Sequence, residues 1–452
     1  LTFTSSEATS NFIANDITVS GCSLGSLSAT STSVYTATCT ATSDGTPSVS
    51  VAADKFTDAV GNDNTVSNTY TWTYDSTVPT MTITSSTVSS GATTNTAAIA
   101  LTFTSSESTT DFVANDITAS GCSLGSLSGS GATYTATCTA TSDGTPSISV
   151  AANKFSDGVG NANSAASNTY TWTYDSTAVT MTISSSAVSS GASTNTAGIA
   201  LTFTASEATS DFASSDITVS GCSLGSTFAA TSTTVYTATC TASSDGTPSV
   251  SVASGAFTDA GSNDNTVSNT YTWTYDGTAP TVAITSSQSA PATGSTFAVT
   301  ITFSESTSNF VNSDITVGGG SSSLSGSGAT YTATITPSAD GTVTVDVAAG
   351  VATDAVGNSN TAATQYSIES DQANAPSITS TAVTTGTEDS AYSYTVTTSD
   401  ADDGTPNSNT VSVACSTCPS WLSYSSTTGK LTGTPSDSAV GANSVVLTAT
   451  DG

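Results

Sequence analysis

The fold of this chain is decided by the stretch Ile99–Ser106, which reads IALTFTSS. Its large apolar side chains, Ile99, Leu101 and Phe103, occupy every second position, and small or polar residues fill the positions between them. This alternation is typical of a β-strand with one face in a core and the other face in water. The stretch therefore predicts a sheet that is buried on one side only.

The same phrase recurs about every hundred residues. It begins as LTFTSSEATS at Leu1, LTFTSSESTT at Leu101, LTFTASEATS at Leu201 and ITFSESTSNF at Ile301. A period of this length is a whole domain rather than one turn of a solenoid. We therefore expect four related domains, followed by a fifth with a different sequence after Ser370.

Each repeat contains further alternating runs. In the second repeat they are Met81–Ser86, Asn115–Ser120, Ala132–Ala140, Ser147–Asn153 and Asn168–Asp175. Turn sequences such as SDGTP at Ser142 separate these runs, and no segment has helical periodicity. Six or seven short strands in about 100 residues favour an immunoglobulin-type β-sandwich. The aromatic row Tyr170, Trp172 and Tyr174 is then expected to pack in the core rather than to bind a ligand.

The predicted architecture is all-β, a tandem array of immunoglobulin-like β-sandwich domains forming an extended rod. The expected domains are 1–78, 79–178, 179–279, 280–371 and 375–452. Short linkers such as Tyr74–Thr80 predict end-to-end stacking, and a ten-residue strand spans about 33 Å, so the rod should exceed roughly 100 Å. The chain begins inside a strand motif, and we expect it to be a segment of a longer protein or a processed form.

The first domain lacks the strand that corresponds to Met81–Ser86, because Leu1 already aligns with Leu101. Two explanations remain open at the level of sequence. The strand lies outside this chain, or another molecule donates it by strand addition.

The charge balance excludes several function classes. The chain has 34 acidic residues, three basic residues and no histidine, for a net charge of −31. Such a surface repels nucleic acid and anionic membranes but suits divalent cations. No apolar run reaches the roughly 18 residues of a membrane span, so we expect no membrane insertion. The absence of histidine and of a glycine-rich phosphate loop predicts a protein that is not an enzyme.

The eight cysteines occur in pairs. They are Cys22 and Cys39, Cys122 and Cys138, Cys222 and Cys240, and Cys415 and Cys418. The fourth repeat has neither cysteine, as expected if the two residues form a disulfide and are lost together. Ile335 replaces the second of them. A metal site is the alternative, but two thiolates without histidine do not make a closed zinc site. We therefore expect disulfides, and hence an oxidising compartment. Cys415 and Cys418 have the spacing of a redox motif, although a local disulfide fits an all-β context better.

The scarce acidic residues recur at fixed places in the repeats. A glutamate follows the second expected strand, an aspartate opens a turn of the type TDAVGN, and another aspartate lies in each linker. We expect Glu107, Asp157 and Asp175, with equivalents that include Glu207, Asp259 and Asp276, to bind Ca²⁺ at the junctions. The alternative is turn chemistry, since aspartate caps turns without any metal.

The repeats resemble bacterial immunoglobulin-like repeats of large surface proteins. The resemblance is carried by FTSSEATSNFIANDITVSG, by YTATCTATSDGTPSVSVAADKFTDAVGN and by the linker DGTAPTVAITS, and it covers about residues 1–370. Residues 375–452 resemble the dystroglycan-type cadherin-like module, through PSWLSYSSTTGKLTGTP followed by VVLTATDG. That second resemblance implies Ca²⁺ ligands among Glu388, Asp402 and Asp403.

The two resemblances imply a non-enzymatic protein outside the cell or on its surface. Its expected role is structural or adhesive, as a stalk or a filament segment, and these alternatives stay open. Expected partners are other copies of itself, surface or matrix proteins, or glycans. A carbohydrate-binding surface module, using Trp421 or Tyr424, is the alternative function.

Overall fold

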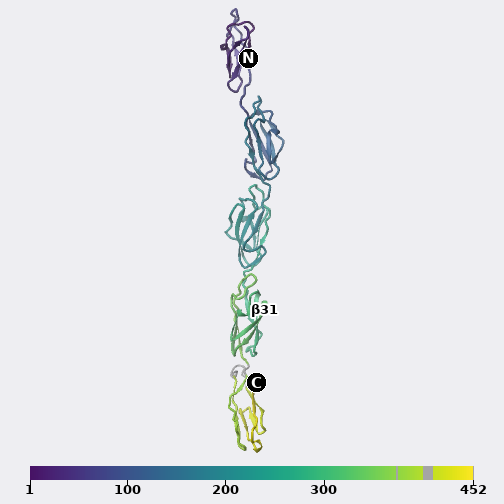
Figure 1. Cartoon of the computed structure of the whole chain (residues 1–452), viewed down its shortest axis with the longest axis vertical. Helices are drawn as coiled ribbons and strands as arrows, with labels where there is room; N and C mark the ends of the chain where they lie inside the picture. Colours follow the sequence, from purple (N-terminus) through teal and green to yellow (C-terminus); the bar gives the residue numbers. More distant parts are fainter. Residues whose placement is uncertain (373–374, 401–410, 451–452) are drawn as a thin grey trace.

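The computed structural model describes residues 1–372, 375–400 and 411–450 of the chain. Five β-domains follow one another along a single long axis, in the order of the sequence (Figure 1). The helical segments among the described residues are 3-10 turns of three residues each. The predicted class is therefore confirmed, since the chain is all-β and its immunoglobulin-like domains form an extended rod.

The second repeat shows the sandwich most fully. One sheet has the strand order β13–β14–β11–β9, the other has the order β12–β15–β16, and β10 pairs with β17 in parallel. The bounds are β9 Met81–Thr84, β10 Thr93–Thr94, β11 Ala98–Thr109, η2 Ala114–Asp116, β12 Ile117–Ser120, β13 Cys122–Leu124, β14 Ser128–Ala140, β15 Ser147–Val150, β16 Tyr170–Thr171 and β17 Thr173–Tyr174.

The alternation in the sequence determines which side chains meet between these sheets. Ile99, Leu101 and Phe103 of β11 are at most 1% exposed. They stand opposite the buried row Cys138, Ala136 and Tyr134 of β14 in an antiparallel register. Trp172 is fully buried, as expected of a core residue, and Tyr174 is half-buried. The core is thus built from the predicted rows.

Repeats 3 and 4 keep this plan. In repeat 3 the sheets are β18–β20–β24–β22, with β23 also on β24, and β21–β25–β26; in repeat 4 they are β28–β29–β31 and β30–β32–β33. The bounds in repeat 3 are β18 Met181–Ser184, β19 Ser193–Thr194, β20 Gly198–Ala205, η3 Ser214–Asp216, β21 Ile217–Ser220, β22 Cys222–Leu224, β23 Ala229–Ala230, β24 Val235–Ala242, β25 Ser249–Val252, β26 Tyr271–Thr272 and β27 Thr274–Tyr275. Those in repeat 4 are β28 Val282–Thr285, β29 Phe297–Thr307, η4 Asn312–Asp314, β30 Ile315–Gly318, β31 Gly320–Pro337, β32 Gly341–Val347 and β33 Tyr366–Ser370.

Repeat 1 differs at one edge. Its sheets are β1–β5–β4, β2–β7–β8 and β3–β6, and within residues 1–78, all of which are described, no strand stands in the place of β9. The bounds are β1 Thr2–Thr4, η1 Ala14–Asp16, β2 Ile17–Ser20, β3 Cys22–Leu24, β4 Ser28–Ala29, β5 Val34–Thr36, β6 Cys39–Ala41, β7 Ser48–Val51 and β8 Tyr70–Thr71. One edge of β1 is consequently open.

The fifth domain has its own topology. Its described strands form the sheet β35–β39–β38 and the pairs β37–β40 and β34–β36. The bounds are β34 Ser377–Ile378, β35 Tyr392–Thr395, β36 Thr398–Ser399, β37 Ser412–Thr417, β38 Leu422–Ser425, β39 Lys430–Gly433, η5 Asp437–Ala439 and β40 Val446–Thr450. A small core gathers around Tyr394, Leu422 and Leu431.

Disulfides join the cysteines in the expected pairs. Cys22 bonds to Cys39, Cys122 to Cys138, Cys222 to Cys240, and Cys415 to Cys418. In repeat 2 the bond links β13 to β14, with a Cα–Cα distance of 5.8 Å. In repeat 4 Ile335 is fully buried opposite Phe297. The other cysteine position is Gly320, where a Cβ atom would lie 2.7 Å from the carbonyl oxygen of Thr336, so the backbone there leaves no room for a side chain.

Candidate metal centre at the domain junctions

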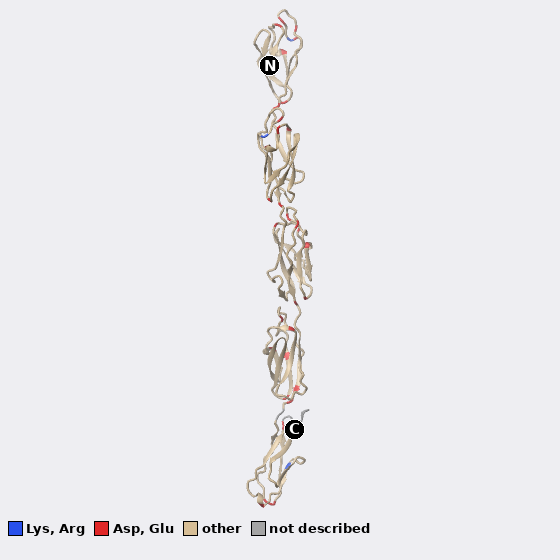
Figure 2. Cartoon of the chain, turned by 90° about the vertical axis from the view of Figure 1, so that its right-hand side faces the viewer, with Lys and Arg blue, Asp and Glu red and all other residues tan. Residues whose placement is uncertain are grey.

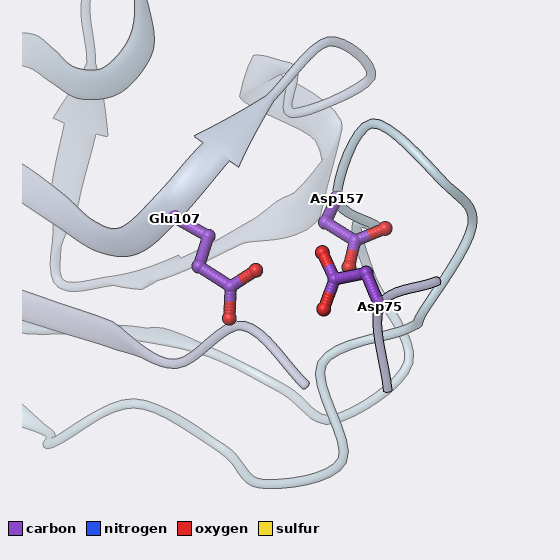
Figure 3. Close-up of side chains that lie close together, drawn as sticks. All are labelled: Asp75, Glu107 and Asp157. Atoms are coloured by element: carbon purple, nitrogen blue, oxygen red, sulfur yellow. The ribbon is translucent and has the colours of Figure 1, made fainter. Parts of the chain in front are cut away.

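Three groups of carboxylates lie at three successive junctions between repeats. Within each group, one ligand oxygen from every acid lies within 4.8 Å of the others. The groups are Asp75, Glu107 and Asp157; Asp175, Glu207 and Asp259; and Asp276, Glu305 and Asp354. Acidic residues gather where domains meet along the rod (Figure 2), and the three side chains of the first group converge on one another (Figure 3).

Each group takes one acid from the linker and two from the downstream repeat. Asp75 lies in the linker after β8, whereas Glu107 lies near the end of β11, where the register with β14 shifts between Thr104 and Thr109. A bulge of this kind turns a side chain in a new direction. A bridge between Thr109 and Asp157 then holds the turn after β15 against the end of β11. The strand pairing thus brings the two downstream acids together.

The turn that contains Asp157 is held by its own carboxylate. The Oδ1 atom of Asp157 accepts hydrogen bonds from the backbone N–H groups of Val159, Gly160 and Asn161, at 2.7–2.9 Å. Its Oδ2 atom accepts one from Nδ2 of Asn161 at 2.8 Å. Burial pushes the pKa of Asp157 upward, but these hydrogen bonds outweigh it and hold the pKa below its usual value. Asp157 is therefore an anion, although it is only 5% exposed.

Asn161 also connects the two domains. Its Nδ2 group donates to the backbone oxygen of Asp75 at 3.0 Å, across the junction. Asn263 and Asn358 make the same bond to the backbone oxygens of Asp175 and Asp276. These asparagines are not among the predicted site residues, although an asparagine follows the turn aspartate by four residues in every repeat, and this spacing is a signal that the sequence contains.

In each group the glutamate is the carboxylate whose charged form is least stabilised by its surroundings. Burial first, and then the negative charges of Asp75, Asp157 and Asp44, raise the pKa of Glu107. Burial and neighbouring carboxylates raise the pKa of Glu207 and of Glu305 in the same way. The Oε1 atom of Glu107 is shielded from water and has no hydrogen-bond partner among the described residues. A buried acceptor without a donor is costly, and a cation would remove that cost.

The linkers are also tied to the upstream repeat. Asp143 accepts hydrogen bonds from the N–H and Oγ of Ser176 and from Oγ1 of Thr177, at 2.7–2.8 Å. Asp44 holds Ser76 and Thr77 in the same manner. At the other end, the Thr180 N–H donates to Oγ of Ser206 at 2.9 Å. The linker is thus fixed on both sides, which limits the bending of the rod.

The groups fit a hard divalent cation. Ca²⁺ takes six to eight oxygen ligands from carboxylates and carbonyls, in flexible geometry. Three converging carboxylates offer oxygens of this kind, and the shielded Oε1 of Glu107 lacks a partner that a cation would supply. The residues that would hold the ion are Asp75, Glu107 and Asp157, with their equivalents at the next two junctions.

The structure corrects one part of the sequence prediction. Asp175 does not join Glu107 and Asp157; it belongs to the next junction, with Glu207 and Asp259. Likewise Asp276 joins Glu305 and Asp354, and Asp75 takes the place assigned to Asp175. The physical reason is that each linker aspartate lies against the domain that follows it. There the asparagine of the turn donates a hydrogen bond to the backbone oxygen of that aspartate.

The acids predicted in the fifth domain do not form such a group among the described residues. Glu388 lies at the surface beside a cavity, and Asp402 and Asp403 lie outside the described residues. A Ca²⁺ site there stays a prediction.

Comparison with protein families decides the membership of the repeats. The family model described as bacterial Ig-like domain matches residues 1–74, 75–174, 175–275 and 276–370. The chain belongs to the bacterial Ig-like domain family. Three of these bacterial Ig-like repeats begin at the linker acids Asp75, Asp175 and Asp276, so the family also places each linker acid with the downstream domain. Residues 375–452 match the family described as "Putative Ig domain".

Two solved structures are similar to the chain at low sequence identity. Invasin, a bacterial integrin-binding protein, is 14% identical over 82% of this chain and 79% of its own, with a TM-score of 0.33. InvD of Yersinia pseudotuberculosis is 17% identical over 64% of this chain and 97% of its own, with a TM-score of 0.31. No curated protein matches the chain.

Families of Ig-like repeats are typically surface-exposed and without enzymatic activity, and this chain is a member of one. Among the described residues, no helix has the length and apolar character that crossing a bilayer requires.

Proposed function

We propose that this chain is a non-enzymatic structural and adhesive rod outside the cell, whose junctions are stiffened by Ca²⁺. It would serve as a stalk or as a segment of a filament, built from the domains 1–78, 79–178, 179–279, 280–371 and 375–452. The observation that carries the proposal is the recurrence of one acidic group at three consecutive junctions of a linear array. Each group joins an upstream linker to a downstream repeat, so an ion bound there would fix the angle between them.

The partners that we propose are other copies of the chain, surface or matrix proteins, or glycans at the far end of the rod. The domains carry their disulfides internally, which favours an oxidising environment outside the cell. A rod of this construction holds a binding end away from the surface that bears it.

Calorimetric titration of the cation-free chain with Ca²⁺ tests the metal part of the proposal. We expect up to three ions per chain, one for each group. The variant Glu107→Gln, Glu207→Gln, Glu305→Gln should lose this binding, because each glutamine removes one charged ligand. Glu7→Gln is the matched control, since Glu7 belongs to none of the carboxylate groups found among the described residues. Equal binding by the triple variant and the wild type would exclude these sites.

A second function rests on a cavity in the fifth domain. Its volume is about 940 Å³, and it is lined by Trp421, Tyr392 and Asn443 among others. The Tyr392 and Trp421 rings meet edge to face at 6.0 Å, and Nε1 of Trp421 donates to Oδ1 of Asn443. Aromatic rings with a few polar groups suit a sugar ring. Screening the chain on a glycan array, with Trp421→Phe beside it, tests this function, and silence of the wild type would dispose of it.

A further inference from the structure

We propose that the cavity of the fifth domain binds amino sugars, that is, sugar rings that carry a free ammonium group. The inference deepens the sugar-binding function proposed above and rests on it. The cavity has a volume of about 940 Å³, and its lining includes aromatic rings, hydroxyl side chains and one carboxylate. Among the described residues that line it, none is basic. Each of these features selects one part of the ligand.

Two aromatic rings form walls of the cavity. Tyr392 and Trp421 both line it, and their rings meet at an interplanar angle of 88°. Trp421 is half-buried, whereas Trp172 and Trp273 are fully buried in the cores of repeats 2 and 3. The face of an aromatic ring carries negative charge density, which attracts a cation, and it also packs against apolar C–H groups. A sugar ring with an ammonium group offers both kinds of contact.

The polar tips of both rings are held by the protein. The hydroxyl of Tyr392 donates to the backbone oxygen of Val383 at 2.6 Å. Nε1 of Trp421 donates to Oδ1 of Asn443, and Nδ2 of Asn443 donates to the backbone oxygen of Ala439 at 2.8 Å. The rings are thus positioned before a ligand arrives, so binding costs less conformational entropy than it would for mobile side chains.

The rest of the lining suits a sugar ring, which has both polar and apolar surfaces. Thr384 and Thr387 are among the residues that contribute hydroxyl groups. Val383, Val440 and Val445 also line the cavity, and they are 46%, 70% and 39% exposed. Exposed apolar side chains that gather at one cavity mark a binding surface. The hydroxyl groups can exchange hydrogen bonds with those of the sugar, while the valines pack against its C–H groups.

The charge of the cavity selects a positive sugar. Glu388 lines the cavity and is exposed. Lys430 is the one basic residue in the sequence 375–452. It precedes Leu431 on β39, and Leu431 lines the cavity, so Lys430 points to the opposite face of the sheet. A sulfated or uronic acid sugar would be repelled by this cavity, whereas an ammonium group would pair with Glu388.

Calorimetric titration of the chain with a glucosamine trimer tests the inference. The N-acetylated trimer, which is neutral, and a trimer of galacturonic acid, which is negative, are titrated beside it. The buffer has a pH of about 5.5, which is above the ordinary pKa of glutamate and keeps the sugar amine protonated. It contains EDTA, which keeps Ca²⁺ from Glu388, and about 0.15 M salt, which screens attraction to the rest of the acidic chain.

We expect one glucosamine trimer per chain, bound about tenfold more tightly than the N-acetylated trimer, and no binding of the galacturonic acid trimer. Glu388→Gln should weaken binding of the glucosamine trimer about tenfold, because the variant removes its charged partner, and should leave the N-acetylated trimer unaffected. Glu7→Gln makes the same exchange in repeat 1 and is the matched control. Trp421→Phe should weaken both trimers, because a smaller ring covers less of the sugar.

Tighter or equal binding of the N-acetylated or galacturonic acid trimer would overturn the choice of amino sugars and leave the sugar-binding function in place. Glucosamine binding that Glu388→Gln does not change would also overturn the inference, because the sugar would then be bound elsewhere on the acidic chain. Silence of all three trimers would overturn it as well, and only a silent glycan array would remove the sugar-binding function with it.

Discussion

The substitution of two cysteines by Gly320 and Ile335 is the most informative change in the chain at the scale of single residues. Repeat 4 keeps the two sheets of repeats 2 and 3 without the disulfide, with Ile335 fully buried where they have sulfur. The bond is therefore a reinforcement of the fold rather than a condition for it. Its expected contribution to the free energy of unfolding is about 3 kcal/mol for a loop of this length.

Reduction should consequently loosen three repeats and spare the fourth. With dithiothreitol, we expect faster hydrogen exchange in the strands of repeats 1, 2 and 3, and no change in β29 and β31. Region-resolved hydrogen-exchange mass spectrometry measures this in one sample, with repeat 4 as the internal control. Equal acceleration in all four repeats would show that the disulfides do not act locally.

The junction glutamates predict an unusual dependence of stability on pH. Because the pKa of Glu107 is raised on folding, the folded chain holds this proton more tightly than the unfolded chain. Stability in EDTA should therefore fall as pH rises from about 4.5 through the folded pKa. Thermal unfolding between pH 4 and 8 measures this. In the triple variant Glu107→Gln, Glu207→Gln, Glu305→Gln, the melting temperature should depend less on pH. The control Glu7→Gln should behave as the wild type. The same pH dependence in the triple variant and the wild type would show that burial and repulsion among the junction carboxylates do not affect stability.

At the scale of strands and linkers, the sequence predicted the elements better than the site. The alternation identifies Leu101 as a residue that faces the core, because successive side chains of a strand point to opposite faces of the sheet. It cannot say which domain a linker acid joins, because Asp175 is close in sequence to the upstream repeat and close in space to the downstream one. That choice depends on the bond from Asn263 to the Asp175 backbone, which is a contact between residues far apart in the chain.

The hydrogen bonds that hold each linker to Asp44, Asp143 or Asp245 should also make the linker sensitive to acid; we call these bonds the linker clamp. Hydrogen bonds from Thr177 and Ser176 hold the pKa of Asp143 below its usual value, so its contribution to stability is present above about pH 3.8 and is lost below it. The variant Asp44→Asn, Asp143→Asn, Asp245→Asn should speed amide exchange at Ser76 and Ser176 at neutral pH. Asp63→Asn, which also exchanges an aspartate for an asparagine but away from the linker, is the control. Unchanged exchange at both serines would exclude the clamp.

At the scale of the whole molecule, the rod results from repetition of one junction. Every junction between bacterial Ig-like repeats contains an equivalent linker acid, an equivalent glutamate after the strand that carries the core row, and the same asparagine turn. Direct contacts between neighbouring domains, such as the bond from Nδ2 of Asn95 to the Ser262 oxygen, add to the linker bonds. The stiffness of the array should thus depend on charge neutralisation at three places rather than on any one domain.

Small-angle X-ray scattering of the chain in Ca²⁺ and in EDTA tests this claim most directly. We predict a longer maximum dimension and a rod-like profile in Ca²⁺, and a shorter, more flexible ensemble in EDTA, because unneutralised carboxylates repel one another at each junction. The triple glutamate-to-glutamine variant should give the same profile in both conditions. Identical profiles of the wild type in Ca²⁺ and in EDTA would contradict the account.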